Sequence, residues 1–201
     1  PDYSSAASDV YKRQVLPVHP PEDAVILVGK DIEPKFTAMN GGPIDWAVED
    51  GVLTAKPSKH HTNHIVSTEM FQDVDIHAEF MTSPIAHGNS GLYIHGHYEM
   101  QIYDSFGVKQ ISQQDEGSLY RFRKPLFNAA RPTGDWQVYD IRFIAPRRDN
   151  DDQILSQGIV KAWLNGKLVQ DGETFTEPRS PYIPYKHGVT CLLYTSDAAD
   201  E

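Results

Sequence analysis

The residues best suited to chemistry lie in one stretch, 89–104, which reads Asn-Ser-Gly-Leu-Tyr-Ile-His-Gly-His-Tyr-Glu-Met-Gln-Ile-Tyr-Asp. Polar and apolar side chains alternate along it with a period of two, which predicts two strands that meet at a tight corner at Gly96-His97. The polar face carries a carboxylate, an amide, phenols and an imidazole, the groups of a sugar-binding or acid–base surface. The candidate catalytic residues are Glu99 and Asp104, and the candidate binding residues of this stretch are Asn89, Tyr93, His95 and Gln101.

A purely structural role competes with function at each of these positions. Glu99 could be a surface carboxylate on a half-exposed strand, but Gln101 and His95 would share its surface, which favours a functional role. Asp104 lies off the strict alternation at a strand end, where it could equally cap the following turn. Asn89 is explained as well by an Asx turn as by contact with a sugar. Glu99 is therefore the best-supported catalytic candidate.

The pair His95 and His97 raises the question of a metal. The two imidazoles could be adjacent ligands on one strand face, or they could form a polar corner. The pattern supplies no clear third ligand and therefore favours the polar corner. We assign no residue to a metal site, and a divalent metal stays open as an alternative.

Two tyrosines outside this stretch are candidates for stacking on a sugar ring. Tyr120 lies in the middle of a short apolar segment, and Tyr139 lies in a long predicted strand. Both could join Trp136 in such a platform, although a tryptophan at a strand start more often belongs to the core. We include Tyr120 and Tyr139 among the candidate binding residues.

Composition excludes several classes of partner. The chain has 201 residues, 28 acidic and 18 basic side chains and a formal net charge of −10. Acidity without a lysine and arginine cluster argues against nucleic acid and against an anionic membrane surface. The chain contains no apolar run long enough to span a bilayer. Its length suits one domain with a full core.

Both ends of the chain resemble translated sequencing adaptor. Residues 8–14 can be encoded by TCA GAT GTG TAT AAG AGA CAG, and the reverse complement of that DNA, in another frame, encodes residues 191–196. We therefore interpret 1–14 and 191–201 as tails foreign to the domain and exclude them from fold reasoning. The single cysteine, Cys191, falls in the second tail, so no thiol or disulfide chemistry is expected.

The segment between the tails is typical of an all-β protein. A proline-rich lead-in, 15–23, precedes a domain over 24–190. Short apolar or alternating segments separated by turn residues predict many strands, and no segment has a convincing helical period. The fold class is therefore all-β, an antiparallel sandwich or jelly roll.

The expected strands follow from local patterns. Asp50-Gly51 and Asn165-Gly166 each lie between two strand patterns and predict hairpins. Segment 74–81 has the clearest alternation of any strand. The remaining expected strands cover 24–28, 64–68, 118–122 and 136–145, with a loop over 107–116 and a charged excursion over 147–157.

Several motifs in series resemble the 3-keto-disaccharide hydrolase domain family. They are Trp-Ala-Val-Glu-Asp-Gly-Val-Leu from Trp46, Gly-Asn-Ser-Gly-Leu-Tyr from Gly88, Tyr-Glu-Met-Gln-Ile-Tyr-Asp-Ser from Tyr98, Gly-Ser-Leu-Tyr from Gly117, Pro-Leu-Phe-Asn-Ala from Pro125, Gly-Asp-Trp-Gln-Val-Tyr-Asp-Ile from Gly134 and Leu-Asn-Gly-Lys-Leu-Val-Gln from Leu164. The resemblance implies a concanavalin-like β-sandwich, a saccharide substrate and a periplasmic or secreted location. The family's closing block, a Leu-Gln-Asp-His-Gly run and an Arg-Asn-Ile strand, should follow His187-Gly188 and is replaced by the second tail, so we expect a sandwich truncated at its C-terminal strand.

The resemblance also implies a reaction, the cleavage of glycosides oxidised at C3. A ketone at C3 acidifies the C2 proton, so that a base can remove it, the C1 substituent can leave and water can add back. The expected strand face has one acid, one amide and one phenol, Glu99, Gln101 and Tyr103. This face lacks the alternating carboxylate pair of ordinary glycosidases. We therefore expect a keto-glycoside hydrolase or lyase; the alternatives are a non-catalytic, lectin-like carbohydrate-binding module and a structural or docking domain.

Overall fold

The computed structural model describes residues 17–39, 41–55, 64–84, 88–96, 98–151, 153–175 and 194–195. All regular secondary structure in these ranges is β-strand. The strands are β1 (Phe36–Ala38), β2 (Ala47–Glu49), β3 (Val52–Thr54), β4 (Ile65–Ser67), β5 (Val74–Met81), β6 (Asn89–Ile94), β7 (Tyr98–Tyr103), β8 (Trp136–Ile144), β9 (Arg147–Arg148), β10 (Ile154–Ser156), β11 (Gly158–Leu164), β12 (Lys167–Phe175) and β13 (Tyr194–Thr195).

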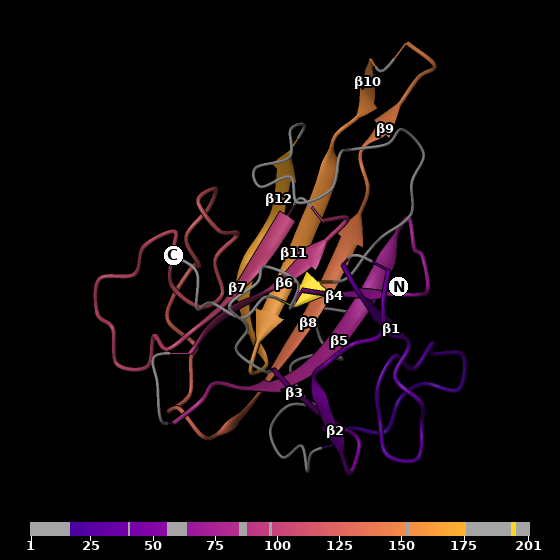
Figure 1. The fold of residues 1–201 in the computed structure, drawn as a ribbon. Helices are drawn as coiled ribbons and strands as arrows, with labels where there is room; N and C mark the ends of the chain where they lie inside the picture. Colours follow the sequence, from indigo (N-terminus) through magenta and orange to yellow (C-terminus); the bar gives the residue numbers. More distant parts are fainter. Residues whose placement is uncertain are drawn as a thin grey trace.

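Two antiparallel sheets form the body of the domain (Figure 1). One has the strand order β1-β4-β13-β6-β7, and the other has the order β12-β11-β8-β5. The β2–β3 and β9–β10 pairs are separate hairpins, and the second extends beyond the sheets at the top of Figure 1. The predicted antiparallel β-sandwich is confirmed.

The core lies between the two sheets and draws on alternate residues of each strand. On β8, Tyr139, Ile141 and Phe143 point inward, while Asp140 and Arg142 point to the opposite face. The other large apolar members of the cluster are Ile76, Leu92, Ile94, Tyr98, Met100, Ile102, Leu119, Val160, Leu164 and Val169. Burial of each such side chain contributes about 1.5–3 kcal/mol to stability. The cluster therefore determines which face of each strand points inward, and functional side chains must lie on the opposite face.

Several local predictions agree with the structure. Strand β5 has the predicted bounds, and the Asp50-Gly51 turn joins β2 to β3. Asn165 and Gly166 have φ of 51° and 75°, the left-handed values that a two-residue hairpin turn requires, and they join β11 to β12. Asparagine and glycine are the residues that adopt these values most readily, which is why the dipeptide was informative.

Other local predictions were wrong. Residues 24–28 form no strand, and the nearest pairing is an isolated bridge between Gly29 and Ile32. The segment 118–122 forms isolated bridges at Leu119 instead of a full strand. Both segments are short and contain apolar side chains. The periodicity of so short a segment does not distinguish a strand from an irregular segment.

Residues Tyr194–Thr195, from the tail that we had excluded from fold reasoning, pair in the first sheet. Tyr194 pairs with Val66 of β4 and with Tyr93 of β6, and Thr195 pairs with Ile65 and Leu92. Main-chain groups of two flanking strands can be satisfied by any extended segment, whatever its side chains. The first sheet thus has a strand position between β4 and β6, which this segment occupies through main-chain pairing.

Candidate active site

The candidate site lies on the face of β6 and β7 opposite to the main core, where Tyr93 is buried in a second, small apolar cluster with Val66 and Met39. The register pairs Asn89 with Tyr103, Gly91 with Gln101, and Tyr93 with Glu99. Directly paired residues of an antiparallel ladder share one face, so these side chains form three adjacent rows. The structure thus brings together the predicted residues Asn89, Tyr93, Glu99 and Gln101, all contributed by the stretch with the clearest chemistry.

The segment 118–120 widens this face beyond the edge of β7. The Gln101 N–H donates to the Ser118 carbonyl at 3.0 Å, and the Tyr120 N–H donates to the Glu99 carbonyl at 2.9 Å. These bonds flank the Met100–Leu119 bridge, so Tyr120 is the direct neighbour of Glu99. Tyr93, Glu99 and Tyr120 therefore form one row, with the carboxylate between two phenols.

The Glu99 side chain packs tightly against the bare backbone of Gly91. A Cβ built on Gly91 would lie 2.2 Å from Glu99 Oε1 and 2.6 Å from its Cγ, far inside van der Waals contact. Only glycine leaves room for the carboxylate in this position. Glu99 is 8% exposed, so it is held in a defined position with a small opening to solvent.

Gln101 connects this face to the following loop. Its Nε2 donates to the Gln114 carbonyl at 3.2 Å, and its Oε1 accepts from the Ile102 N–H at 3.2 Å. The side chain is 3% exposed. Both ends of the amide are thus engaged with the protein, and Gln101 positions the loop beside Glu99.

Asp104 lies beyond the end of β7 and apart from the Glu99 row. Its N–H donates to the Gly88 carbonyl at 3.1 Å. Its negative charge raises the pKa of Glu116, which is buried beside the core. Asp104 follows the last residue of β7, so the alternation of this strand does not place its carboxyl group on the face of Glu99.

Glu116 is a buried acid that the sequence analysis did not select. Its carboxylate accepts from Gln137 Nε2 at 3.0 and 3.3 Å, and its N–H donates to Ser105 Oγ at 2.9 Å. Burial raises the pKa of Glu116 to about 8, and the charge of Asp104 raises it too, whereas the Gln137 bond opposes them. The group is thus largely protonated at neutral pH. It lies in a glutamine-rich loop segment where no sequence pattern distinguishes it.

We expect Glu116→Gln to stabilise the protein at alkaline pH. The pKa is 4.5 for a free carboxyl and about 8 here, so the unfolded chain loses the proton first as pH rises. The contribution of Glu116 to the free energy of unfolding should fall by about 1.4 kcal/mol per pH unit between these two pKa values, and it should stay constant at higher pH. Urea denaturation measures this effect. The free energy of unfolding of the variant, relative to that of the native chain, should be higher near pH 9 than near pH 5. A difference that is independent of pH would contradict the assignment.

His95 does not share the surface of Glu99, contrary to our expectation. It has φ of 57° and belongs to the turn after β6, so the strand alternation ends before it. Its ring packs edge-on against Phe143 of the core at 4.8 Å, and Nε2 lies 3.2 Å from the Gln72 carbonyl oxygen. Burial lowers the pKa of His95, which favours the neutral imidazole. The metal alternative lies partly outside the described residues because His97 is not among them.

Tyr139 is a core residue, and the prediction that it stacks on a sugar was wrong. Its side chain is fully buried and stacks on Phe80 at 5.1 Å between centroids. The phenol O–H donates to the Gln101 carbonyl and accepts from the Gly117 N–H at 2.7 Å. The strand pattern indicated an aromatic at this position but not the face on which it lies. Tyr139 therefore supports the site from beneath.

Tyr139→Phe should destabilise the fold by about 2 kcal/mol, because it removes two buried hydrogen bonds and leaves a buried N–H less well satisfied. Thermal or urea unfolding measures this loss. Because Tyr139 does not reach the surface, the affinity of the folded variant for saccharide should stay within about twofold of the native value. A large loss of affinity in a stable variant would restore Tyr139 as a contact residue.

Ser118 is a further polar residue that the sequence analysis did not select as a site residue. It sits next to Gln101 on the widened face and is fully buried. Its Oγ has no hydrogen-bond partner among the described residues. Ser118 belongs to the motif Gly-Ser-Leu-Tyr that begins at Gly117, and this motif could have indicated it. Only the tyrosine of that motif, Tyr120, was among the predicted binding residues.

The described residues hold no group of three or more histidine, cysteine, aspartate or glutamate side chains placed to bind a metal ion. In the same ranges, no helix has the length and apolar character needed to cross a membrane.

Comparison with known proteins gives matches of two kinds. The family model described as 3-keto-alpha-glucoside-1,2-lyase-like domain matches residues 24–195 and confirms the resemblance seen in the motifs. A crystal structure at 2.13 Å resolution, named as a "putative glycosyl hydrolase" from Parabacteroides distasonis ATCC 8503, has a TM-score of 0.75 and 26% identity over 93% of this chain and 88% of that one. A second structure of that description from the same organism, at 1.70 Å, has a TM-score of 0.56 and 21% identity over 81% and 82%, and shows similarity of fold alone. Among curated proteins, none matches this chain.

Proposed function

The chain belongs to the 3-keto-alpha-glucoside-1,2-lyase-like domain family, and from this premise we propose that it cleaves the glycosidic bond of 3-keto-glycosides, including 3-keto-disaccharides. The broader function, that of an enzyme hydrolysing glycosides, is supported by the family and by the name of the similar crystal structure. The observation that carries the finer proposal is the single carboxylate of the Tyr93–Glu99–Tyr120 row, pressed against Gly91.

One positioned carboxylate suits elimination next to a ketone. Glu99 takes the C2 proton, and the electron pair of that C–H bond forms the enolate with the C3 carbonyl. Collapse of the enolate restores the C3 carbonyl, forms the C1–C2 double bond and expels the C1 substituent, which leaves with the proton that Glu99 removed. Water then adds across the double bond, with hydroxyl at C1 and a proton at C2, so the net reaction is hydrolysis. Such a step needs one base and hydrogen-bond donors for the enolate oxygen.

The neighbouring residues supply the donors. The phenols of Tyr93 and Tyr120 flank Glu99 in its row and are proposed to donate to the substrate, together with the Asn89 amide at the start of β6. Gln101 takes the place where double-displacement glycosidases have a second carboxylate. Asp104 is proposed as a positioning residue that acts through Glu116 and the loop, since it lies away from the row.

The test is aglycone release from a 3-keto-glucoside and from the matching unoxidised glucoside, each with and without a chelator. Release from the keto sugar alone is the expected result, because only the ketone makes the C2 proton acidic enough for a carboxylate base. Equal release from both substrates would overturn the elimination route. The chelator arm decides whether a divalent metal takes part.

A non-catalytic carbohydrate-binding module is the second candidate. The observation that favours it is the low exposure of Glu99, which is 8% exposed. A carboxylate with so little access is poorly placed to take a proton from a substrate, whereas the face around it can still bind a sugar. Retained saccharide affinity with no release from either glucoside would select this function.

A further inference from the structure

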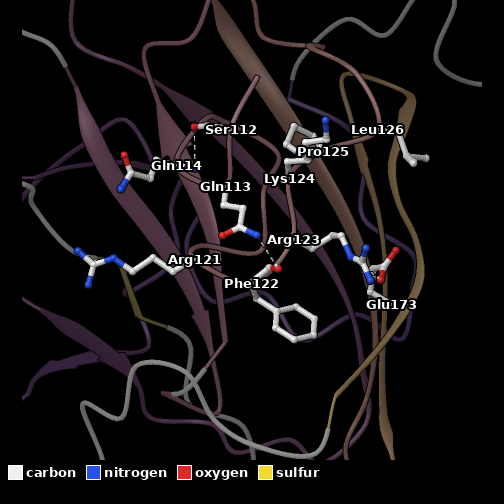
Figure 2. Close-up of a pocket in the computed structure, with 10 residues that line it drawn as sticks. All are labelled: Ser112, Gln113, Gln114, Arg121, Phe122, Arg123, Lys124, Pro125, Leu126 and Glu173. Carbon is white, nitrogen blue, oxygen red and sulfur yellow. Dashed lines mark hydrogen bonds and ion pairs between the residues drawn. The ribbon is translucent and has the colours of Figure 1, made fainter. Parts of the chain in front are cut away.

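A tight turn at residues 119–123 borders the Glu99 row and forms part of the wall of a cavity of about 720 Å³. The two end residues of the turn pair through two backbone hydrogen bonds of 2.9 and 2.8 Å. At its tip, the Arg121 N–H donates to the Gln113 carbonyl at 3.0 Å. Figure 2 shows a second bond of this glutamine, from its Nε2 to the Phe122 carbonyl at 3.2 Å. The backbone of the turn is therefore held at its base and at its tip.

The backbone of Arg121 has a conformation that its residue type disfavours. Its φ is 57°, in the left-handed region. Of the described non-glycine residues, five have a positive φ, and the other four are aspartate, asparagine or histidine, the types most often found there. Glycine would adopt this φ without the cost that a Cβ imposes. The position thus favours glycine, and the presence of an arginine needs an explanation in its side chain.

The side chain of Arg121 lies over the ring of Tyr120. The guanidinium carbon is 4.9 Å from the ring centroid, within the distance at which a cation and an aromatic ring attract each other. In Figure 2, Arg121 extends to the side opposite to Arg123, which pairs with Glu173 at 2.9 Å. Arg121 also makes a further interaction, so the ring is not its sole partner. The stacked guanidinium restrains the Tyr120 ring from one face.

The backbone alone does not determine where the Tyr120 phenol points. The Tyr120 N–H donates to the Glu99 carbonyl at 2.9 Å, which places the residue beside Glu99 but leaves two side-chain torsions to be set. Tyr120 is half-buried, so neighbouring side chains restrict its ring only in part. In the proposed function this phenol donates to the substrate, and the direction of the ring decides whether it can. A guanidinium stacked on the ring selects one direction.

We propose that Arg121 is a positioning residue, which holds the Tyr120 ring so that its phenol meets the substrate beside Glu99. The role of the phenol rests on the proposed function. The orientation of the ring by Arg121 rests on the stacked contact and on the disfavoured backbone. The bonds that fix the turn supply the rigid frame that such a contact needs, because a mobile arginine would restrain nothing.

Variants of Arg121 separate this role from a purely structural one. Arg121→Gln should lower kcat/KM for a 3-keto-glucoside by about tenfold, and Arg121→Lys should stay within about threefold of the native value, because an ammonium can also lie over the ring. Arg121→Gly should lose as much activity as Arg121→Gln but unfold at a temperature no lower, because glycine relieves the backbone. Native activity in Arg121→Gly would overturn the proposal. The control Asp31→Gly, at a φ of 60°, should keep full activity.

The variant Tyr120→Phe shows whether Arg121 acts through the phenol, since it keeps the ring and removes only the donor. If Arg121 acts through the phenol, adding Arg121→Gln to Tyr120→Phe should change kcat/KM by less than about twofold. A further loss of about tenfold would refute the positioning role, because Arg121 would then act through its other interaction or directly on the substrate.

Binding without turnover keeps the two proposals apart. Isothermal titration with the unoxidised glucoside is carried out on the native chain, the two single variants and the double variant. Cleavage of the keto sugar with no coupling between Arg121 and Tyr120 would refute the positioning role and leave the reaction standing. Binding without cleavage would refute the reaction, and the same coupling, measured in Kd, would then support or refute the positioning role. Neither binding nor cleavage by the native chain would refute both.

Discussion

Glu99→Gln should lower kcat for cleavage of a 3-keto-glucoside by about 10³-fold, because the amide cannot accept the C2 proton and general-base catalysis contributes about 10²–10⁴-fold. The amide has nearly the shape of the carboxylate, so it can occupy the same space over Gly91. Steady-state release of aglycone from the keto sugar measures the effect, and KM should change little.

The matched control is Glu69→Gln, which alters a carboxylate on the surface paired with Lys35 at 3.6 Å. This variant should keep full activity, because exposed ion pairs of this kind contribute about 0–1 kcal/mol to stability and Glu69 is not among the residues of the candidate site. Both variants should unfold close to the native temperature. Undiminished turnover in Glu99→Gln would remove the residue from the mechanism.

Gly91→Ala should reduce kcat by about 10²-fold through displacement of Glu99. The new methyl group would lie 2.2 Å from Glu99 Oε1, so the carboxylate must move. A shift of about 1 Å in a catalytic group can cost about 10²-fold in rate. The stability cost should be smaller, since the atoms that must give way belong to a flexible side chain.

Gly29→Ala is the control for a glycine substitution as such. A Cβ on Gly29 would meet its neighbours at 3.5 and 3.6 Å, which is ordinary contact, so activity should be retained. The double variant Gly91→Ala/Glu99→Gln separates the causes. If Gly91 acts only through Glu99, the double variant should be no slower than Glu99→Gln. An additional loss of about 10²-fold would assign Gly91 a direct role.

The site face was predictable because it follows from strand alternation. Once β6 and β7 pair through a tight corner, the register decides that Glu99, Gln101, Tyr93 and Asn89 share one side. The period of two in the sequence contains this information directly. The antiparallel sandwich was predictable for the same reason, since many short alternating segments need a second layer to bury their apolar faces.

The failures occurred where a local backbone change or a distant contact decides the outcome. His95 leaves the strand face because of its positive φ, a feature of the turn that composition does not reveal. Tyr139 lies in a regular strand, but its inward orientation follows from packing against the other sheet. The neutral state of Glu116 depends on burial by elements far apart in the chain. Each of these requires tertiary structure.

The loop segment 105–131 is fastened to the sheets at several points along its length. Tyr139 and Gln170 bond to the backbone of Gly117, Asn165 Nδ2 donates to the Ala129 carbonyl at 2.9 Å, and Gln101 holds Gln114. The conformational entropy of these loops is therefore lost during folding and not during binding. The protein should act as a preorganised receptor, in which ligand selection depends on a shape already in place and little binding free energy is lost in ordering the loops.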